Sequence, residues 1–157
     1  MAKKKSWREK LEDSKDLPKI EPIPPRLEKS WGVGVFVVPA PIEVDALMRS
    51  VKRGRVTTIN EIRAALAKRH GADVCCRITA GIFAWIAANA AADDLAQGKT
   101  RVTPYWRPLK ADGELNPKYP GGIQDVRARL EAEGHRVRVR GKRLFVVDFD
   151  KRLAPLK

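Results

Sequence analysis

The pattern of apolar and polar positions divides the chain into a polar N-terminal segment, one short strand and a series of helices. Residues 1–31 are rich in Lys, Glu and Pro and hold few apolar side chains, which predicts a flexible basic arm. Residues 32–41 join β-branched and aromatic side chains between Gly and Pro, and they predict a short buried strand. In residues 42–51 apolar positions recur at helical spacing, so we expect a helix there.

Two further helices follow, joined by a short turn that contains glycine. Thr58 precedes Glu61 by three residues, the pattern of a capping box at a helix start, and Gly71 is placed to end that helix. The second helix is rich in alanine and has an apolar stripe at helical spacing, made of Ile78, Ile82, Phe83 and Ile86. Such a pair in a basic chain indicates a helix-turn-helix.

The C-terminal third predicts a loop, a helix and a hairpin. A loop rich in Pro and Gly spans residues 103–122, and residues 123–134 have one apolar face and end in glycine, which predicts a third helix. Residues 135–150 alternate basic and apolar side chains, turn at Gly141 and return as an apolar strand. This pattern is typical of a β-hairpin.

Alternation along the first hairpin strand separates two faces. Val137 and Val139 are expected to face the core, and the opposite face carries Arg136, Arg138 and Arg140. An arginine face beside a helix-turn-helix is the layout of a wing that follows a phosphate backbone. The alternative is a solvated hairpin edge protected by charge. The whole pattern predicts a mainly α fold with a small β-hairpin, a winged helix-turn-helix over residues 32–157.

Composition and charge narrow the function. The chain has 157 residues, of which 43% are hydrophobic, enough for one compact domain. Its formal net charge is +13, which favours a polyanionic partner, and double-stranded DNA is the leading candidate. Since the sequence has no apolar run of about 18 residues, we expect no membrane partner and a cytoplasmic, nucleoid-associated protein.

Metal and cofactor chemistry is not expected. The two cysteines, Cys75 and Cys76, are adjacent and so are expected to be reduced thiols, and the two histidines lie far apart in the sequence. No zinc-ligand spacing results, and neither a dinucleotide fingerprint nor a phosphate loop occurs.

Three motifs resemble, in order, the DNA alkyltransferases that remove alkyl groups from the 6-oxygen of guanine. "GRVTTINEIRAAL" is similar to that family's helix-turn-helix entry, "TPYWRPLKADGELNPKYPGG" to its Pro-Cys-His-Arg-Val active-site loop, and "LEAEGHRV" to its Glu-Gly ending. The match covers residues 42–137. The resemblance implies a DNA-binding fold and a pocket for a base turned out of the duplex.

The reactive residues of that family are replaced in this chain. Tyr105 stands at the position of the alkyl-accepting cysteine and Trp106 at that of the activating histidine, whereas Arg107 and Glu133 match the family. A phenol with a pKa near ~10 is a poor nucleophile without a strong base. The chain therefore resembles the alkyltransferase-like proteins, which bind a damaged base without repairing it.

The resemblance also implies site residues. Tyr105, Trp106, Arg107 and Glu133 would form a lesion pocket in which the two aromatic rings stack on an extruded base. The alternative is that the rings are core aromatics that hold the loop against the helices. Further DNA contacts are assigned to the hairpin arginines, to Arg77 at the start of the recognition helix, to Thr58 and to Asn89, the last matching a hinge asparagine.

Three functions remain open at this point. The first is a non-enzymatic, monomeric binder of DNA with alkylated guanine as its candidate ligand and DNA repair proteins as further partners. The second is an alkyltransferase whose acceptor thiol has moved to Cys75 or Cys76, where a helix N-terminus would lower the thiol pKa. The third is a general DNA-binding protein with a vestigial pocket.

Overall fold

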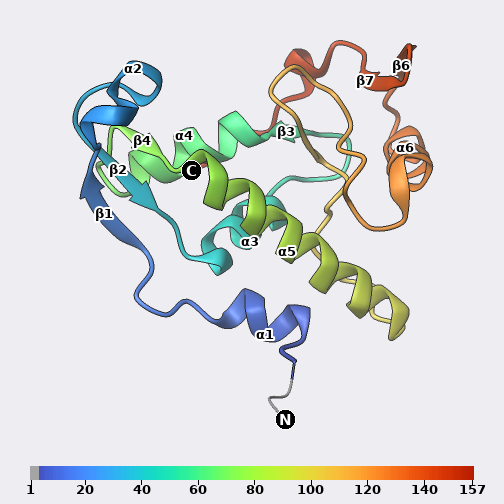
Figure 1. Cartoon of the computed structure of the whole chain (residues 1–157). Helices are drawn as coiled ribbons and strands as arrows, with labels where there is room; N and C mark the ends of the chain where they lie inside the picture. The colour runs from blue at the N-terminus through green and yellow to red at the C-terminus, as the bar shows by residue number, and fades with distance from the viewer. Residues whose placement is uncertain (1–3) are drawn as a thin grey trace.

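The structure, a computed structural model, describes residues 4–157 (Figure 1). Its longer helices are α3 (Pro41–Arg49), α4 (Ile59–Arg69), α5 (Arg77–Ala96) and α6 (Gly122–Ala132). Shorter helical segments are α1 (Trp7–Glu12), η1 (Pro25–Leu27), α2 (Glu28–Trp31) and η2 (Phe149–Arg152). The strands are β1 (Lys19–Pro22), β2 (Val35–Val38), β3 (Thr57–Thr58), β4 (Val74–Cys75), β5 (Pro108–Leu109), β6 (Val137–Arg140) and β7 (Arg143–Val146).

The fold is mixed α/β, which corrects the expectation of a mainly α chain. β2 pairs antiparallel with β1 and parallel with β4, while β3 pairs parallel with β5. Strands β3, β4 and β5 are two residues long, too short for an alternating pattern to be visible in the sequence. They exist because tertiary packing brings distant segments into register.

The predicted helices and hairpin are confirmed. Helix α4 ends at Arg69, and Gly71 follows with φ +64°, a left-handed conformation that glycine adopts without strain. In the hairpin, β6 pairs antiparallel with β7 from Val137–Val146 to Arg140–Arg143. Val139 is exposed rather than in the core, whereas Leu144, its partner on β7, is buried.

The segment predicted to be a flexible arm differs from that expectation over residues 4–31. Ser6 caps α1 by accepting a hydrogen bond from the Glu9 amide (3.1 Å), and Leu11 is completely buried. The Trp7 ring meets Trp85 of α5 edge to face, with 4.8 Å between centroids. Two apolar residues four apart are a signal too short to identify a helix. Residues 1–3 of the predicted arm lie outside the described residues.

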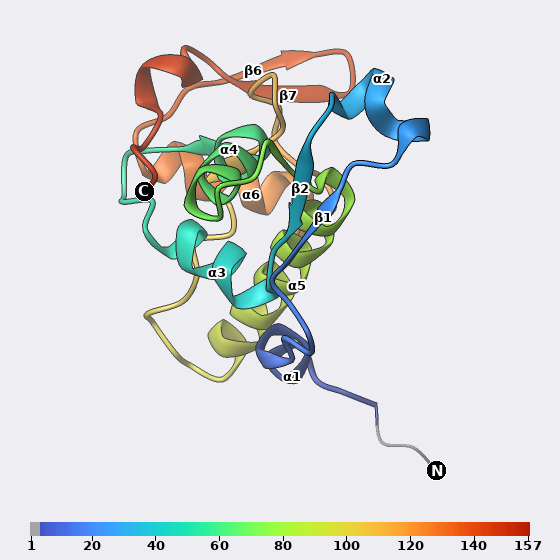
Figure 2. The same ribbon diagram turned by 90° about the vertical axis from the view of Figure 1, so that its left-hand side faces the viewer.

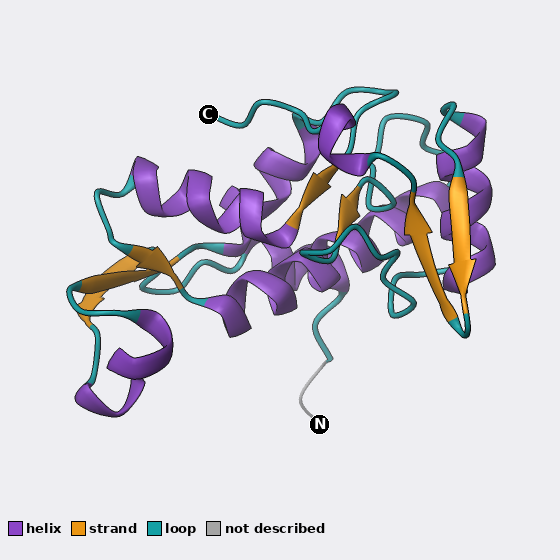
Figure 3. Cartoon of the chain, turned by 90° about the horizontal axis from the view of Figure 1, so that it is seen from above, coloured by secondary structure: helices purple, strands orange, loops and turns teal. Residues whose placement is uncertain are grey.

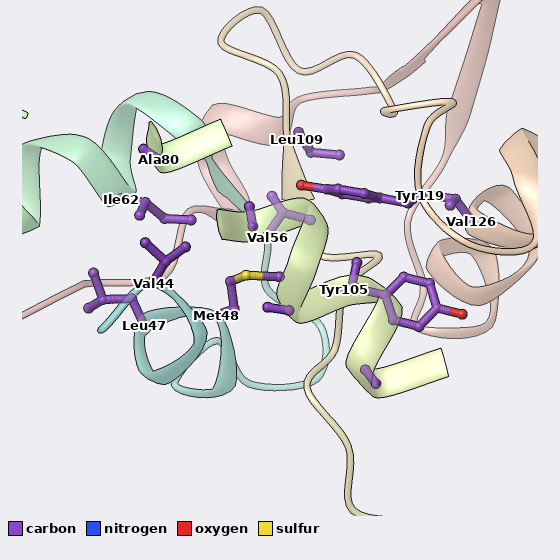
Figure 4. Packing of buried hydrophobic residues seen from close by; sticks show 14 of the residues in the cluster. Val44, Leu47, Met48, Val56, Ile62, Ala80, Tyr105, Leu109, Tyr119 and Val126 are labelled. Atoms are coloured by element: carbon purple, nitrogen blue, oxygen red, sulfur yellow. The ribbon is translucent and has the colours of Figure 1, made fainter. Parts of the chain in front are cut away.

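The core lies between α5 and the helices α3 and α4 (Figure 4). Helix α5 buries alanines at helical spacing, namely Ala80, Ala84, Ala87, Ala88 and Ala91. Against them pack larger side chains of α3 and α4, including Val44, Leu47, Met48, Ile62 and Leu66. Small side chains let helices approach closely, so the larger side chains of α5 are left to the opposite face.

The loop between β5 and α6 is fastened to the hairpin. The Leu115 amide donates to the Leu144 carbonyl (2.8 Å), and the Val146 amide donates to the Gly113 carbonyl (3.0 Å). Gly113 has φ +88°, and a Cβ there would lie 2.4 Å from the Phe149 ring. Only glycine fits this turn, which holds the loop against β7 and η2.

The two remaining projections lie on one side of the molecule. Figures 2 and 3 show the α2 segment and the turn between β6 and β7 extending on the same side as the N-terminal half of α5. In residues 4–157, no helix combines the length and the apolar character needed to cross a membrane.

Candidate nucleic-acid interface

The residues at the reactive positions of the loop form a closed ionic cluster. Glu133, at the end of α6, accepts a hydrogen bond from the Trp106 indole (3.0 Å) and two from the Arg107 guanidinium (3.0 and 2.7 Å). Arg107 also donates to the Val51 carbonyl. The cluster therefore ties the loop to α6 and to the segment after α3.

Glu133 is held as a carboxylate. Burial by itself would raise the pKa of Glu133, but the hydrogen bonds from Arg107 and Trp106 outweigh burial and lower that pKa below its usual value. At neutral pH the group accepts hydrogen bonds and holds no proton to donate. Its geometry is that of a structural ion pair rather than of an acid or base next to a nucleophile.

The Tyr105 side chain is buried in the core and does not line the hollows described below. It is 2% exposed, and its ring lies edge to face against Trp106 (5.3 Å) and Tyr119 (6.5 Å). Figure 4 shows its ring near that of Tyr119. The Arg129 guanidinium lies 5.6 Å from the Tyr105 ring centroid and 5.0 Å from that of Trp106. The structure thus places Tyr105 in the core and Trp106 as a partly buried ring packed against it, and both lie between the loop and the helices.

The Tyr105 hydroxyl is unsuited to nucleophilic attack. It donates to an Asp125 carboxylate oxygen at 3.4 Å. Burial raises the pKa of Tyr105 above its ordinary value of 10.0, although Arg129 acts in the opposite direction. The hydroxyl stays protonated at neutral pH, so a phenolate acceptor is not available.

Both cysteines are buried thiols. Cys75 is 2% exposed, and burial raises the pKa of its thiol to about 12, with Arg63 only partly opposing this rise. Cys76 stands at the N-cap position of α5 without a capping hydrogen bond from its side chain, and it packs against Ile23 and Phe36. Buried thiols of high pKa are inert, because the thiolate is the nucleophile.

Two residues expected to contact DNA, Thr58 and Asn89, make hydrogen bonds within the chain. Thr58 is buried at the start of α4, where its hydroxyl accepts a hydrogen bond from the Glu61 amide (3.2 Å). The Asn89 side chain donates to the Trp85 carbonyl within α5 (2.9 Å). Because α5 continues unbroken to Ala96, Asn89 is not at a hinge.

Arg77 is placed as expected, at the exposed first position of α5. A helix N-terminus carries a partial positive charge and unpaired amides, so an arginine there adds to a site that favours anions. Arg63 of α4 lies near enough for the positive charge of Arg77 to lower the Arg63 pKa, after burial. This end of α5 is therefore electropositive.

A hollow of about 680 Å³ lies on the outward face of α5. It is lined by Ile78, Gly81, Ile82, Trp85, Asn116 and Lys118. Of the apolar stripe that the sequence shows on this helix, Ile78 and Ile82 are exposed, Phe83 and Ile86 pack against the core, and the alanines fill the buried face. The spacing of the alanines was the available signal for the buried face. Asn116 and Lys118 had no signal of their own, because their loop is placed by tertiary contacts.

The hairpin arginines are exposed. Arg138 and Arg140 line a hollow of about 390 Å³ on the outer face of the hairpin, and Arg136 lines an adjoining one with Lys151 and Arg152. Arg143 is instead held by Glu114 (3.0 and 2.8 Å) and Asp112 (2.8 Å). Within residues 4–157, no group of three His, Cys, Asp or Glu side chains is placed to hold a metal ion.

The fold is similar to that of a solved DNA complex. S. pombe Atl1 in complex with damaged DNA containing O6-carboxymethylguanine is 17% identical, with a TM-score of 0.51, over 73% of this chain and 94% of that one. S. pombe ATL in complex with DNA is 18% identical over the same shares, with a TM-score of 0.47. No protein-family profile and no curated protein matches the chain. The resemblance to the alkyltransferase-like proteins is therefore confirmed at the level of the fold.

Proposed function

We propose that this chain binds double-stranded DNA and recognises damaged bases, alkylated guanine among them, without accepting the alkyl group. One observation carries this proposal. In a fold similar to that of Atl1, Tyr105 and Trp106 stand at the two positions for a nucleophile and its base. The Tyr105 ring packs against Trp106, and the Trp106 indole donates a hydrogen bond to Glu133. The hollow on α5 is lined by other residues and stays open.

The DNA would lie along the side of the molecule that carries α5. Arg77 and the N-terminus of α5 favour phosphate there, and we propose that the β6–β7 hairpin acts as a wing whose Arg138 and Arg140 follow the backbone. The net charge of +13 supplies the long-range attraction.

An extruded base would enter the hollow on α5. Its apolar lining offers contact to the faces of a base, and Asn116 and Lys118 offer hydrogen bonds to its edge. The buried ring of Tyr105 then acts behind the hollow as support rather than as a stacking surface. Unstacking costs less at a damaged pair, so a pocket without a nucleophile still selects lesions.

The decisive experiment compares two duplexes that differ only in one guanine, methylated on its 6-oxygen in one of them. We expect tighter binding to the methylated duplex and an unchanged protein mass after incubation. Lys118→Ala should reduce only the preference for the methylated duplex, while Arg138→Ala should weaken binding to both. Equal affinity for both duplexes would leave a general DNA-binding protein with a vestigial pocket.

Binding should weaken steeply with salt. Each neutralised phosphate contributes about −0.9 to the slope of log affinity against log salt. Replacing Arg138 and Arg140 with serine should therefore make the slope shallower by about 0.9 per arginine, equally for all sequences. Fluorescence anisotropy at about 50 to 200 mM salt measures the affinity and hence the slope. A flat response would contradict DNA as the partner.

The buried thiols should be dispensable. The double variant Cys75→Ser, Cys76→Ser should bind both duplexes like the parent, because the high pKa of Cys75 excludes a thiolate at neutral pH. Intact mass spectrometry of both proteins after incubation with methylated duplex is the measurement. A mass gain of one methyl group in the parent alone would establish the alternative, an alkyltransferase with a relocated acceptor.

The remaining features of the proposal concern its setting. We propose that the chain acts as a monomer in the cytoplasm, associated with the nucleoid, and that DNA repair proteins act on the lesion that it marks. Size-exclusion chromatography with light scattering, with and without duplex, tests the monomer.

A further inference from the structure

The hollow that Arg136 lines with Lys151 and Arg152 lies at the base of the β6–β7 hairpin, where the segment after α6 meets η2. Its volume is about 290 Å³, and His135 and Asp148 complete its polar lining. Figure 2 shows η2, the red helical turn, at the end of the hairpin away from the β6–β7 turn and on the opposite side from α2. The hollow is therefore separate from the surface along which DNA is proposed to lie.

Three cations surround this hollow without acidic partners. Arg136, Lys151 and Arg152 are exposed, and within residues 4–157 none of the three forms an ion pair. Like charges that line one hollow repel one another, and an anion bound between them removes that repulsion. Arginine offers a planar fork of N–H donors that matches phosphate oxygens, and lysine adds a compact charge. The hollow therefore fits a phosphate group.

A buried imidazole in the same hollow lacks a hydrogen-bond partner. His135 is 6% exposed, and its Nε2 atom has no partner in the described part of the chain. Burial lowers the pKa of His135, an effect that Glu133 opposes. The charges of Arg152 and Arg107 lower that pKa further. An unpaired buried polar atom is unfavourable, and a phosphate oxygen would supply the missing partner.

Asp148 indicates what the phosphate is attached to. Its φ of +55° is a left-handed conformation that Asp and Asn adopt more readily than other side chains. A carboxylate repels a free phosphate ion but accepts a hydrogen bond from a hydroxyl group. Small-ligand sites have volumes of about 300–1,000 Å³, and this hollow, at about 290 Å³, lies at the lower limit. That size suits a phosphate with a sugar attached rather than a polymer.

We propose that this hollow binds a phosphate monoester that carries sugar hydroxyls, as a nucleoside monophosphate does. Arg136, Lys151 and Arg152 bind the phosphate, and His135 donates a hydrogen bond to it from Nε2. Asp148 accepts a hydrogen bond from a sugar hydroxyl. A phosphate monoester carries a charge of about −1.5 to −2 at neutral pH, whereas each phosphate of DNA carries one negative charge. Three cations therefore favour the monoester.

The test follows the imidazole rings by NMR. The chain has two histidines, and His70, whose Nε2 lies 2.6 Å from a Glu43 carboxylate oxygen, serves as the internal reference. Adenosine 5′-monophosphate should shift the ring resonances of His135 and leave those of His70 in place. Adenosine, which lacks the phosphate, should move neither. Sulfate at high concentration, whose charge is constant between about pH 5 and 8, should raise the pKa of His135.

A double variant tests the cations. Lys151→Ala with Arg152→Ala should weaken the binding of adenosine monophosphate at least about ten-fold, as measured by calorimetry. Arg26→Ala with Lys29→Ala is the matched control, because it removes the same two charges from exposed positions on η1 and α2. The control should bind the nucleotide like the parent. Both pairs are exposed, so both variants should keep the fold.

Asp148→Gly tests the sugar contact. Glycine adopts a positive φ without strain, so the turn before η2 is kept. Loss of the carboxylate removes the repulsion toward free phosphate and the acceptor for the sugar hydroxyl. The ratio of the affinities for adenosine monophosphate and orthophosphate should therefore fall by about ten-fold relative to the parent.

Four outcomes would overturn the proposal. Two are His135 resonances that do not move with adenosine monophosphate, and an equal loss of affinity in the two double variants. A third is equal affinity of the parent for orthophosphate and the nucleotide, which would leave a site for free phosphate. The fourth is displacement of the nucleotide by duplex DNA, which would assign the hollow to the DNA interface. Failure of the chain to bind DNA would refute only the proposed function, because the nucleotide titrations contain no duplex.

Discussion

Glu133→Ala should lower the free energy of unfolding by about 3–5 kcal/mol, because it leaves the Arg107 guanidinium without its buried partner. Glu133 is 4% exposed and accepts three hydrogen bonds from Trp106 and Arg107. Urea unfolding followed by circular dichroism provides the measurement. Glu131→Ala is the matched control. Glu131 forms an exposed i, i+4 pair with Arg127 (3.3 Å), so its removal should cost less than about 0.5 kcal/mol.

The same cluster predicts a dependence on pH. Because the pKa of Glu133 is lowered in the folded state, its ionisation stabilises the fold at any pH above the unfolded pKa, near ~4.3. That contribution is lost as pH falls through the lower folded pKa. The stability difference between the parent and Glu133→Gln should therefore shrink in acid. A constant difference between pH 7 and about 3 would mean that the carboxylate charge contributes nothing.

Tyr105→Ala should cost about 3–5 kcal/mol of stability, as expected for the loss of a buried aromatic ring. The ring is in contact with Trp106, Tyr119 and Arg129, and its removal leaves a cavity beside α6. Tyr105→Phe keeps the ring and removes only a long hydrogen bond to Asp125, so it should cost about 1 kcal/mol or less. Urea unfolding of both variants measures the two effects.

DNA titration of the same variants separates support from recognition. Folded Tyr105→Phe should bind methylated and plain duplex like the parent, because the hydroxyl is turned toward Asp125 and not toward the hollow. If Tyr105→Ala instead kept the stability of the parent and lost only its preference for methylated duplex, the ring would contact the base directly. The buried position of Tyr105 would then describe only the free protein.

The reactive positions could be assessed from the sequence, because they depend on which residue types stand in the loop. Tyr105 and Trp106 in place of a cysteine and a histidine already argue against alkyl transfer, while Arg107 and Glu133 match the family but carry no sign that they pair with each other. The structure adds the reason for their retention. The pair holds the loop, and the carboxylate that remains accepts hydrogen bonds from Trp106 as well as from Arg107.

The sequence by itself determined the helices and the hairpin, because these elements depend on residues close together in the chain. Periodic apolar positions specified α3, α4 and α6, and Gly71 marked the end of α4. Alternating residues on both sides of Gly141 specified the hairpin. These features follow from neighbours a few residues apart, so a single chain segment contains the signal.

Only the tertiary structure decided which face of α5 is buried and what α5 presents to a partner. Both its alanines and its isoleucines lie at helical spacing, so periodicity fits either face. The choice depends on how closely α3 and α4 can approach, and close approach requires small side chains at the contact. The same packing placed α1 against α5, paired β1 with β2 and brought Asn116 and Lys118 to the isoleucines. Contacts between residues far apart in the chain depend on the packing of the whole fold, and no local pattern records them.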